Sequence, residues 1–164
     1  MKRVLVIGCP GAGKSTFSRK LSAKTGLPIH YLDMIWHTPD RTNIGKEEFD
    51  KRLESILQPD EWIIDGNYLR TMPRRLEECD TVFFLDIPLD DCLAGVTGRL
   101  GKPREDMPWI DTEFDEDFHQ WILGFNIRQR PEIVRLLNTF DGEIFHFKSR
   151  EEADDYIDSL IDSK

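Results

Sequence analysis

Cysteines are few in this chain and long apolar runs are missing, and each shortage narrows the class of protein. The three cysteines, Cys9, Cys79 and Cys92, lie far apart and form no C-x-x-C pair. This spacing argues against a disulfide framework and for a reducing compartment. The apolar run after residues 1–3 is four residues long, which is too short for a signal peptide. No stretch approaches the roughly 20 apolar residues of a membrane span, so we expect a soluble cytoplasmic protein.

Clusters of basic residues are missing as well. The formal net charge is −9, and lysines and arginines stand singly or in pairs among acids. Proteins that bind nucleic acids through the phosphate backbone need basic clusters, because the release of counterions drives that binding. The composition therefore argues against nucleic acid as the main partner, while the 39% of hydrophobic residues predicts a packed globule.

Internal repeats, linkers and low-complexity tracts are missing too, which predicts one domain over residues 1–164. Short apolar runs alternate with stretches of helical spacing. This alternation predicts the α/β class, a parallel sheet with helices on both faces, whose ligands bind at the carboxyl ends of the strands. The predicted strands are residues 4–7, 29–32, 62–64, 81–85 and 144–147. The predicted helices are residues 13–25, 46–57, 89–98 and 114–137, with a bend at Pro131, and a last helix capped by Ser149.

A polar segment interrupts the alternation after residue 98. It contains Gly101, Pro103 and Pro108 and shows neither a helical nor a strand period. We therefore expect a mobile loop that acts as a lid at about residues 99–112. Aromatic residues follow at helical spacing and are expected in the core; they are Phe114, Phe118, Trp121 and Phe125.

A phosphate-binding motif lies between the first predicted strand and the first predicted helix. Residues 8–15, Gly-Cys-Pro-Gly-Ala-Gly-Lys-Ser, match G-x-x-x-x-G-K-[ST]. The glycines let backbone N–H groups approach phosphates, and the helix adds the positive end of its dipole. Lys14 is expected to reach the β- and γ-phosphates and Ser15 to coordinate Mg²⁺. The motif thus predicts that Mg-ATP is bound by Gly8, Pro10, Gly11, Ala12, Gly13, Lys14, Ser15 and Thr16.

Carboxylates follow three of the predicted strands. Asp65 ends the third strand and is expected to hold the magnesium shell through water, although Asp-Gly is also a turn dipeptide. Asp33 ends the second strand, where it would orient or deprotonate a hydroxyl acceptor, position a phosphate acceptor, or cap a helix. Asp86 follows the fourth strand and is a weaker candidate, because the sequence around it also fits a turn.

Arginines are candidates for stabilising the charge that develops on a transferring phosphoryl group. Arg99 and Arg128 bracket the expected lid and are predicted to be catalytic. An isolated arginine is more often a solvated surface residue, so that alternative stays open for each of them. Weaker candidates, for the lid or the acceptor, are Arg70, Arg74, Arg75, Arg104 and Arg130.

With these motifs in place, the chain resembles adenylate-kinase-like P-loop proteins, and in particular the bacterial group named DNA topology modulation or flagellin-regulation-related proteins. The resemblance implies a P-loop NTPase fold of the nucleotide-kinase type, with a five-stranded sheet and a small lid. Within it, Arg70 matches the arginine that holds the acceptor phosphate, and Arg99 matches the second of two lid arginines. The stretches that carry the resemblance are 8–15, 31–33, 64–68, 84–88 and 118–131.

Two positions depart from the adenylate kinase pattern. The first lid arginine corresponds to Gly95, and the acceptor-phosphate arginine three residues after the second-strand aspartate corresponds to Trp36. Both departures count against AMP as the acceptor. They leave triphosphate binding untouched, because that prediction rests on residues 8–15.

The sequence therefore predicts a kinase, similar to nucleoside monophosphate kinases, that moves the γ-phosphoryl group of Mg-ATP to a nucleotide or another small acceptor. Arg70 favours a nucleoside monophosphate, whereas Trp36 and Asp33 favour a hydroxyl compound, and both alternatives stay open. ATP is the default nucleotide because no Asn/Thr-Lys-x-Asp guanine motif occurs. The acceptor and the oligomeric state do not follow from the sequence.

A different class of function also fits the motif. It is a nucleotide-dependent regulator of the DNA topology modulation type, which would hydrolyse ATP slowly and bind a partner. A third alternative, a nucleotide-binding module without turnover, conflicts with the intact phosphate loop and Asp65.

Overall fold

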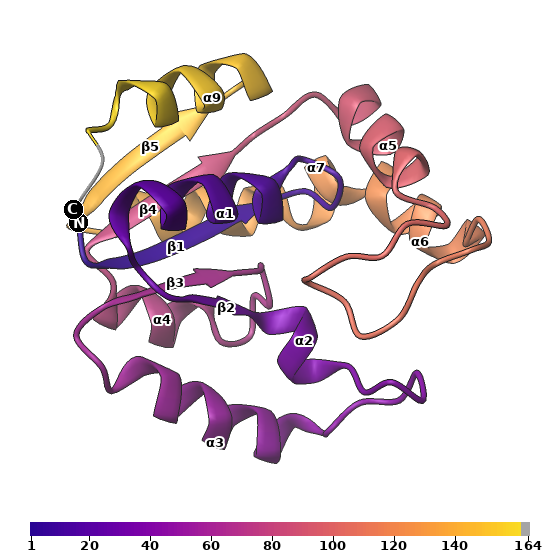
Figure 1. The fold of residues 1–164 in the computed structure, drawn as a ribbon, viewed down its shortest axis with the longest axis horizontal. Helices are drawn as coiled ribbons and strands as arrows, with labels where there is room; N and C mark the ends of the chain where they lie inside the picture. The colour runs from indigo at the N-terminus through magenta and orange to yellow at the C-terminus, as the bar shows by residue number, and fades with distance from the viewer. Residues whose placement is uncertain (162–164) are drawn as a thin grey trace.

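The computed structural model describes residues 1–161 and is built on a five-stranded parallel sheet (Figure 1). The strand order is β2-β3-β1-β4-β5, which places the first strand at the centre. Because every pairing is parallel, all strands end at the same edge of the sheet. The strands are β1 Arg3–Gly8, β2 Ile29–Tyr31, β3 Trp62–Asp65, β4 Thr81–Leu85 and β5 Glu143–Phe147.

Helices cover both faces of the sheet, as predicted. The described residues form α1 Lys14–Thr25, α2 Leu32–Trp36, α3 Lys46–Leu57, α4 Met72–Glu78, α5 Leu89–Gly98, α6 Glu116–Leu123, α7 Phe125–Arg128, α8 Arg130–Asn138 and α9 Arg150–Ser159. In Figure 1, α1 lies in front of the sheet, α9 lies above β5 and α4 lies behind the sheet, while α2, α5 and α6 lie beyond the strand ends. Within residues 1–161, no helix combines the length and the apolar character needed to cross a bilayer.

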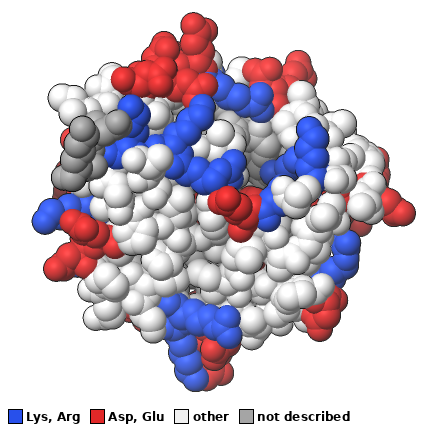
Figure 2. Space-filling model, in the orientation of Figure 1, with Lys and Arg blue, Asp and Glu red and all other residues white. Residues whose placement is uncertain are grey.

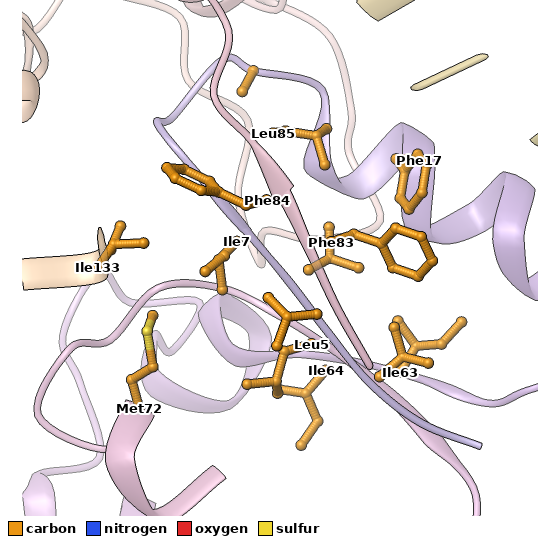
Figure 3. Close-up of a cluster of buried hydrophobic side chains, with 14 of the residues drawn as sticks. Leu5, Ile7, Phe17, Ile63, Ile64, Met72, Phe83, Phe84, Leu85 and Ile133 are labelled. Atoms are coloured by element: carbon orange, nitrogen blue, oxygen red, sulfur yellow. The ribbon is translucent and has the colours of Figure 1, made fainter. Parts of the chain in front are cut away.

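The core has two apolar layers, one on each face of the central strands (Figure 3). On one face, Phe17 of α1 packs on Phe83 of β4 with ring centroids 4.9 Å apart. On the other face, Ile7 points toward Met72 of α4 and Ile133 of α8. Residues 4–7 of β1 are fully buried. A strand that is covered on both faces has no polar alternation, which explains its continuous apolar run.

Besides one-residue shifts at the ends of β1, β3, β5 and α1, the elements differ from the predictions in three places. β2 ends one residue early and Leu32 opens α2, because a buried helix residue and a strand residue give the same apolar signal. Helix α4 was missed, although Pro73 in its first turn is a helix-start signal. The predicted helix 114–137 is three helices that break at Gly124 and at Gln129, and Pro131 lies in the first turn of α8. The Arg128 guanidinium lies where a Cβ at Gly124 would be, and this flexible end could shift to make room for it.

The aromatic residues that were expected in the core divide into two groups. Phe125 is buried, whereas Phe114 and Trp121 are 52% and 37% exposed. Phe114, Phe118 and Trp121 line a large cleft at the strand ends instead. The core prediction was therefore wrong for Phe114 and Trp121, because helical spacing shows which residues share a face and not what that face meets.

Candidate active site

The phosphate loop joins β1 to α1 at the edge where the strands end, which confirms its predicted context. Gly11 (φ 83°) and Gly13 (φ 99°) have left-handed backbones that favour glycine. An alanine Cβ at Gly11 would overlap the carbonyl oxygen of Cys92 in α5. Residues 10–16 line the cleft, and Gly8 is held by neighbouring side chains.

Lys14 is the first residue of α1, and its side chain bends back over the loop. Its Nζ donates to the carbonyl oxygens of Gly8 at 2.9 Å and Cys9 at 3.3 Å. These partners are neutral, so the ammonium group can exchange them for anionic oxygens at a gain. Ser15 and Thr16 follow in the first helical turn, where unpaired N–H groups and the helix dipole favour an anion. The loop is thus arranged to bind phosphates.

Two residues outside the motif hold the loop in place. Asn67 pairs with both backbone groups of Gly8, accepting from its N–H at 3.0 Å and donating to its carbonyl oxygen at 2.7 Å. Arg150 donates from Nη2 to the carbonyl oxygens of Gly11 at 2.7 Å and Asp91 at 2.8 Å. Sequence reasoning missed both roles because the partners are 59 and 139 residues apart. The available signal for Asn67 was its place two residues after Asp65.

Asp65 ends β3 and lies buried in the wall of the cleft. It is 7% exposed and accepts a hydrogen bond from Ser18 Oγ at 3.3 Å. Burial raises the pKa of Asp65 to about 7, against the opposing charge of Lys14. The negative charge of Asp65 is only partly balanced by Ser18 and Lys14, so a bound cation would stabilise it. The carboxylate of Asp65 and the hydroxyl of Ser15 are oxygen donors that fit Mg²⁺, which usually takes one or two protein ligands beside phosphates and water.

Asp33 lies on α2 and also lines the cleft. Its Oδ1 accepts a hydrogen bond from the Tyr68 hydroxyl at 2.6 Å and lies 3.9 Å from His37 Nε2. The Asp33 side chain is 42% exposed, so solvent or a ligand reaches it. The helix-cap alternative does not apply, because Tyr31 occupies the cap position of α2.

Arg75 is fully buried and shapes the loop that follows β3. Its guanidinium donates to the carbonyl oxygens of Gly66 at 3.0 Å and Tyr68 at 3.3 Å, and also to that of Asn67. Burial lowers the pKa of Arg75 to about 9, which leaves the side chain charged at neutral pH. Arg75 therefore holds backbone and does not face an acceptor, contrary to its weaker sequence-based assignment.

Of the other predicted arginines, Arg99 lines the cleft, whereas Arg70 and Arg128 do not. Arg99 lines the cleft, and its Nε is buried without a hydrogen-bond partner among residues 1–161. Arg70 forms a two-point ion pair with Asp50 of α3, at 3.0 and 2.8 Å, outside the cleft lining. Arg128 is exposed on α7 and folds over Gly124. The roles of Arg70 and Arg128 stay predictions.

The segment 99–112 is irregular, as predicted, and many of its residues line the cleft. Arg104 pairs with Asp106 at 3.1 Å, and the Trp109 ring meets the His37 ring edge-on at 5.0 Å. The Arg41 guanidinium lies 5.2 Å from the centre of the same indole. This segment, the phosphate loop, α2 and parts of other elements line an open cleft of about 1330 Å³. Basic and acidic side chains are intermixed over the face drawn in Figure 2.

Asp86 follows β4 at the same edge of the sheet but belongs to a separate cluster. Arg130 donates to its two oxygens at 2.9 and 2.7 Å, and His146 Nε2 lies 2.8 Å from Oδ2. Asp86 is not in the cleft lining. This carboxylate therefore joins β4, β5 and α8, and Arg130 is engaged there as well.

Comparisons with known proteins agree with this geometry at the level of fold. No protein-family model matches the chain. It is 32% identical over 88 residues to an adenylate kinase of Thermotoga neapolitana, covering 52% of this chain and 39% of that enzyme. It is 33% identical over 107 residues to the adenylate kinase of Caldicellulosiruptor saccharolyticus, covering 61% and 48% of the two chains. The chain thus spans less than half the length of these relatives.

Solved structures match over almost the whole chain. A shikimate kinase from Acinetobacter baumannii, in complex with shikimate, superposes with a TM-score of 0.62 at 16% identity, over 96% of this chain and 91% of the other. A sugar kinase from Janibacter superposes with a TM-score of 0.56 at 17% identity and the same coverage. Identities this low indicate shared fold alone. The chain therefore has the kinase-like P-loop NTPase fold.

Proposed function

We propose that this chain is a phosphotransferase that moves the γ-phosphoryl group of Mg-ATP to a nucleotide or another small acceptor. The observation that carries the proposal is one shared cleft, lined by residues 10–16, Asp65, Arg99 and Asp33. Its volume of about 1330 Å³ exceeds what one small ligand needs. The similarity to adenylate kinases and the kinase-like fold support the same function.

The phosphate loop would hold the donor. Lys14 would exchange the carbonyl oxygens that it now contacts for oxygens of the β- and γ-phosphates. Ser15 and Asp65 would hold Mg²⁺, which when bound neutralises charge on those phosphates. Arg99, with its unpartnered Nε, would stabilise the transferring group, and Arg128 would have to turn from Gly124 to join it.

Two kinds of acceptor remain compatible with the proposal. An acceptor phosphate would recruit Arg70, which would first have to leave Asp50. An acceptor hydroxyl would use Asp33, which already lines the cleft beside Tyr68. Within a single domain of residues 1–164, closure of the lid at 99–112 would exclude water and favour transfer over hydrolysis.

The test is release of ADP from Mg-ATP by the purified chain, with and without a panel of nucleoside monophosphates, nucleosides and small metabolites. We expect one class of acceptor to stimulate release and to appear as a phosphorylated product. Lys14→Ala should abolish the stimulation. The matched control is Lys51→Ala on α3, whose ammonium group is exposed and 3.8 Å from Glu47.

Two outcomes would count against the proposal. Wild-type turnover by Lys14→Ala would remove its basis. Slow ADP release that no acceptor stimulates would instead favour a nucleotide-switched regulator of the DNA topology modulation type, and a search for its partner would follow.

A further inference from the structure

The acceptor end of the cleft is acidic and aromatic. Asp33 and the lid carboxylates Asp106 and Asp111 all interact electrostatically with Arg99, and Glu105 lines the same cleft. Arg104 pairs with Asp106 at 3.1 Å and lies 3.9 Å from Asp111. The rings of Trp36, Tyr68 and Trp109 also line it, and Trp109 meets His37 of α2. Carboxylates repel a phosphate or carboxylate group, whereas they accept hydrogen bonds from hydroxyl and ammonium groups. Around Arg99 and Arg104 these carboxylates are in excess, which favours an acceptor without an anionic group.

The arginines that follow β3 are engaged away from this end. Arg70 is paired with Asp50, Arg74 donates to Glu54 at 2.9 Å, and Arg75 is buried against backbone carbonyls. Recognition of an acceptor phosphate usually relies on arginine in two-point contact. Moving Arg70 into the cleft would break both of its hydrogen bonds to Asp50.

The two carboxylate oxygens of Asp33 have different surroundings, as a proton acceptor requires. Its Oδ1 accepts from Tyr68, and Oδ2 has no hydrogen-bond partner among residues 1–161. Tyr68 is fixed on its own side: its backbone is left-handed (φ 36°), its carbonyl accepts from Arg75 at 3.3 Å, and its ring stacks on Phe49 at 5.2 Å. Burial raises the pKa of Tyr68, so the phenol stays protonated and donates. One oxygen of Asp33 is thus hydrogen-bonded, and the other has no partner on a side chain that lines the cleft and is 42% exposed.

We infer that the acceptor is a hydroxyl group of a small phosphate-free compound, such as a sugar, polyol or amino alcohol, and that Asp33 is its general base, positioned by Tyr68. This inference rests on the proposed phosphotransferase function. The acceptor oxygen forms a bond to the γ-phosphorus while the bond from that phosphorus to the β,γ-bridging oxygen breaks. The hydroxyl proton passes to Asp33 and then to solvent, and ADP leaves with the bridging oxygen.

The experiment separates acceptor class from phosphotransfer itself. The full chain is incubated with Mg-ATP and three pools: nucleoside monophosphates; sugars, polyols and amino alcohols; and hydroxy acids. Phosphorus NMR distinguishes a phosphomonoester from a nucleoside diphosphate, and calorimetry measures Mg-ATP binding separately. We expect a phosphomonoester from the second pool. Nucleoside diphosphate as the product, or Mg-ATP binding with no product from the second pool, would overturn the inference and leave donor binding standing. No Mg-ATP binding would overturn the proposed function with it.

Variants test the two residues. Asp33→Asn should lower kcat for the hydroxyl acceptor by about 10²–10⁴-fold, the usual contribution of a general base. Asp141→Asn, an exposed carboxylate in the loop before β5, should leave kcat unchanged. Equal kcat values for Asp33→Asn and wild type would overturn the role of Asp33.

The role of Tyr68 has a readout that a purely structural residue would not move. Asp33 faces Tyr68, His37 on its own helix, Asp65 at the end of β3 and Arg99 after α5. In Tyr68→Phe the phenol no longer stabilises the carboxylate. The acidic limb of the kcat/KM profile should therefore move to higher pH, with kcat down about 5–10-fold for one lost hydrogen bond. An unmoved limb would contradict the positioning role.

Discussion

The donor and acceptor ends of the cleft are built in different ways. At the donor end, the loop is fixed by left-handed glycines and by Asn67 and Arg150, which bond to backbone groups. At the acceptor end, side chains pair with one another: Arg104 pairs with Asp106 within the lid, and just outside the cleft lining Arg70 of the loop after β3 pairs with Asp50 of α3. A backbone-built end has one shape and tolerates few changes. The Arg70–Asp50 pair is about half exposed and rearranges at small cost, because exposed pairs contribute little.

The largest expected effect is at the donor end. Lys14→Ala removes the ammonium group that would reach the β- and γ-phosphates. We expect turnover to fall on the order of 10²–10³-fold, as for other losses of transition-state charge stabilisation. Initial rates of ADP release measure this loss. If the fall is no larger than that for a variant at the acceptor end, the contrast between the two ends is wrong.

The second prediction tests whether the loop depends on glycine for space or for backbone conformation. Gly11→Ala places a Cβ against the Cys92 carbonyl, while Gly26→Ala has a similar φ, 79° against 83°, and no atom within 4 Å of the new Cβ. Gly26→Ala should cost about 1 kcal/mol in unfolding free energy and Gly11→Ala about 2–4 kcal/mol, because overlap adds to strain. Urea unfolding gives both values. If the two variants lose the same unfolding free energy, the close contact between Gly11 and the Cys92 carbonyl of α5 does not matter for stability.

The third prediction concerns Asn67, which ties the loop after β3 to the loop after β1. Asn67→Asp keeps the shape and the bond from the Gly8 N–H, but it cannot donate to the Gly8 carbonyl oxygen. We expect Mg-ATP affinity to fall by about 1–2 kcal/mol, roughly 5–30-fold, for a lost hydrogen bond and an added negative charge. Calorimetric titration measures the change. Unchanged Mg-ATP affinity in Asn67→Asp would show that Asn67 does not contribute to donor binding and that residues 8–15 are sufficient.

Sequence predicted the donor end better than the acceptor end for a physical reason. Residues 8–15 carry their own geometry, because glycine conformations and the start of α1 are local properties. The five strands were predicted as well, since each contains a short run of β-branched or aromatic residues. Arg75, Arg70 and Asn67 have partners that only the folded chain brings near, so no local pattern reports them. Gly124 was missed because the Arg128 side chain that covers it is a matter of packing.

The fourth prediction uses Asp86 as a reference outside both ends. Burial by itself would raise the pKa of Asp86. The hydrogen bonds from Arg130 and His146, with their charges, lower this pKa by more than burial raises it, so it lies below its ordinary value. A lowered pKa contributes stability above the unfolded value of about 3.9 and loses it as the pH falls through the folded value. Asp86→Asn should therefore cost about 1 kcal/mol at pH 7 and less as the pH falls below about 4. Urea unfolding at pH 7 and pH 3 checks this, with Asp141→Asn as the control.

The smallest expected effect separates the two acceptor classes most sharply. If the acceptor carries no phosphate, Arg70 only pairs with Asp50 on the surface, and Arg70→Ala should change KM for the acceptor by less than about threefold. If the acceptor is a nucleoside monophosphate, loss of a two-point arginine contact should raise KM by about 10–100-fold, because charge-assisted bonds are the stronger ones.

Asp50→Asn refines this test, because it releases Arg70 without removing it. A released arginine that binds an acceptor phosphate would lower KM, whereas one without a ligand would leave KM unchanged. Steady-state kinetics of the two variants with the same acceptor therefore report whether the ion pair at this end is a resting contact or a lasting one. A large loss in Arg70→Ala together with a gain in Asp50→Asn would assign the acceptor end to a phosphate and remove the contrast drawn between the two ends.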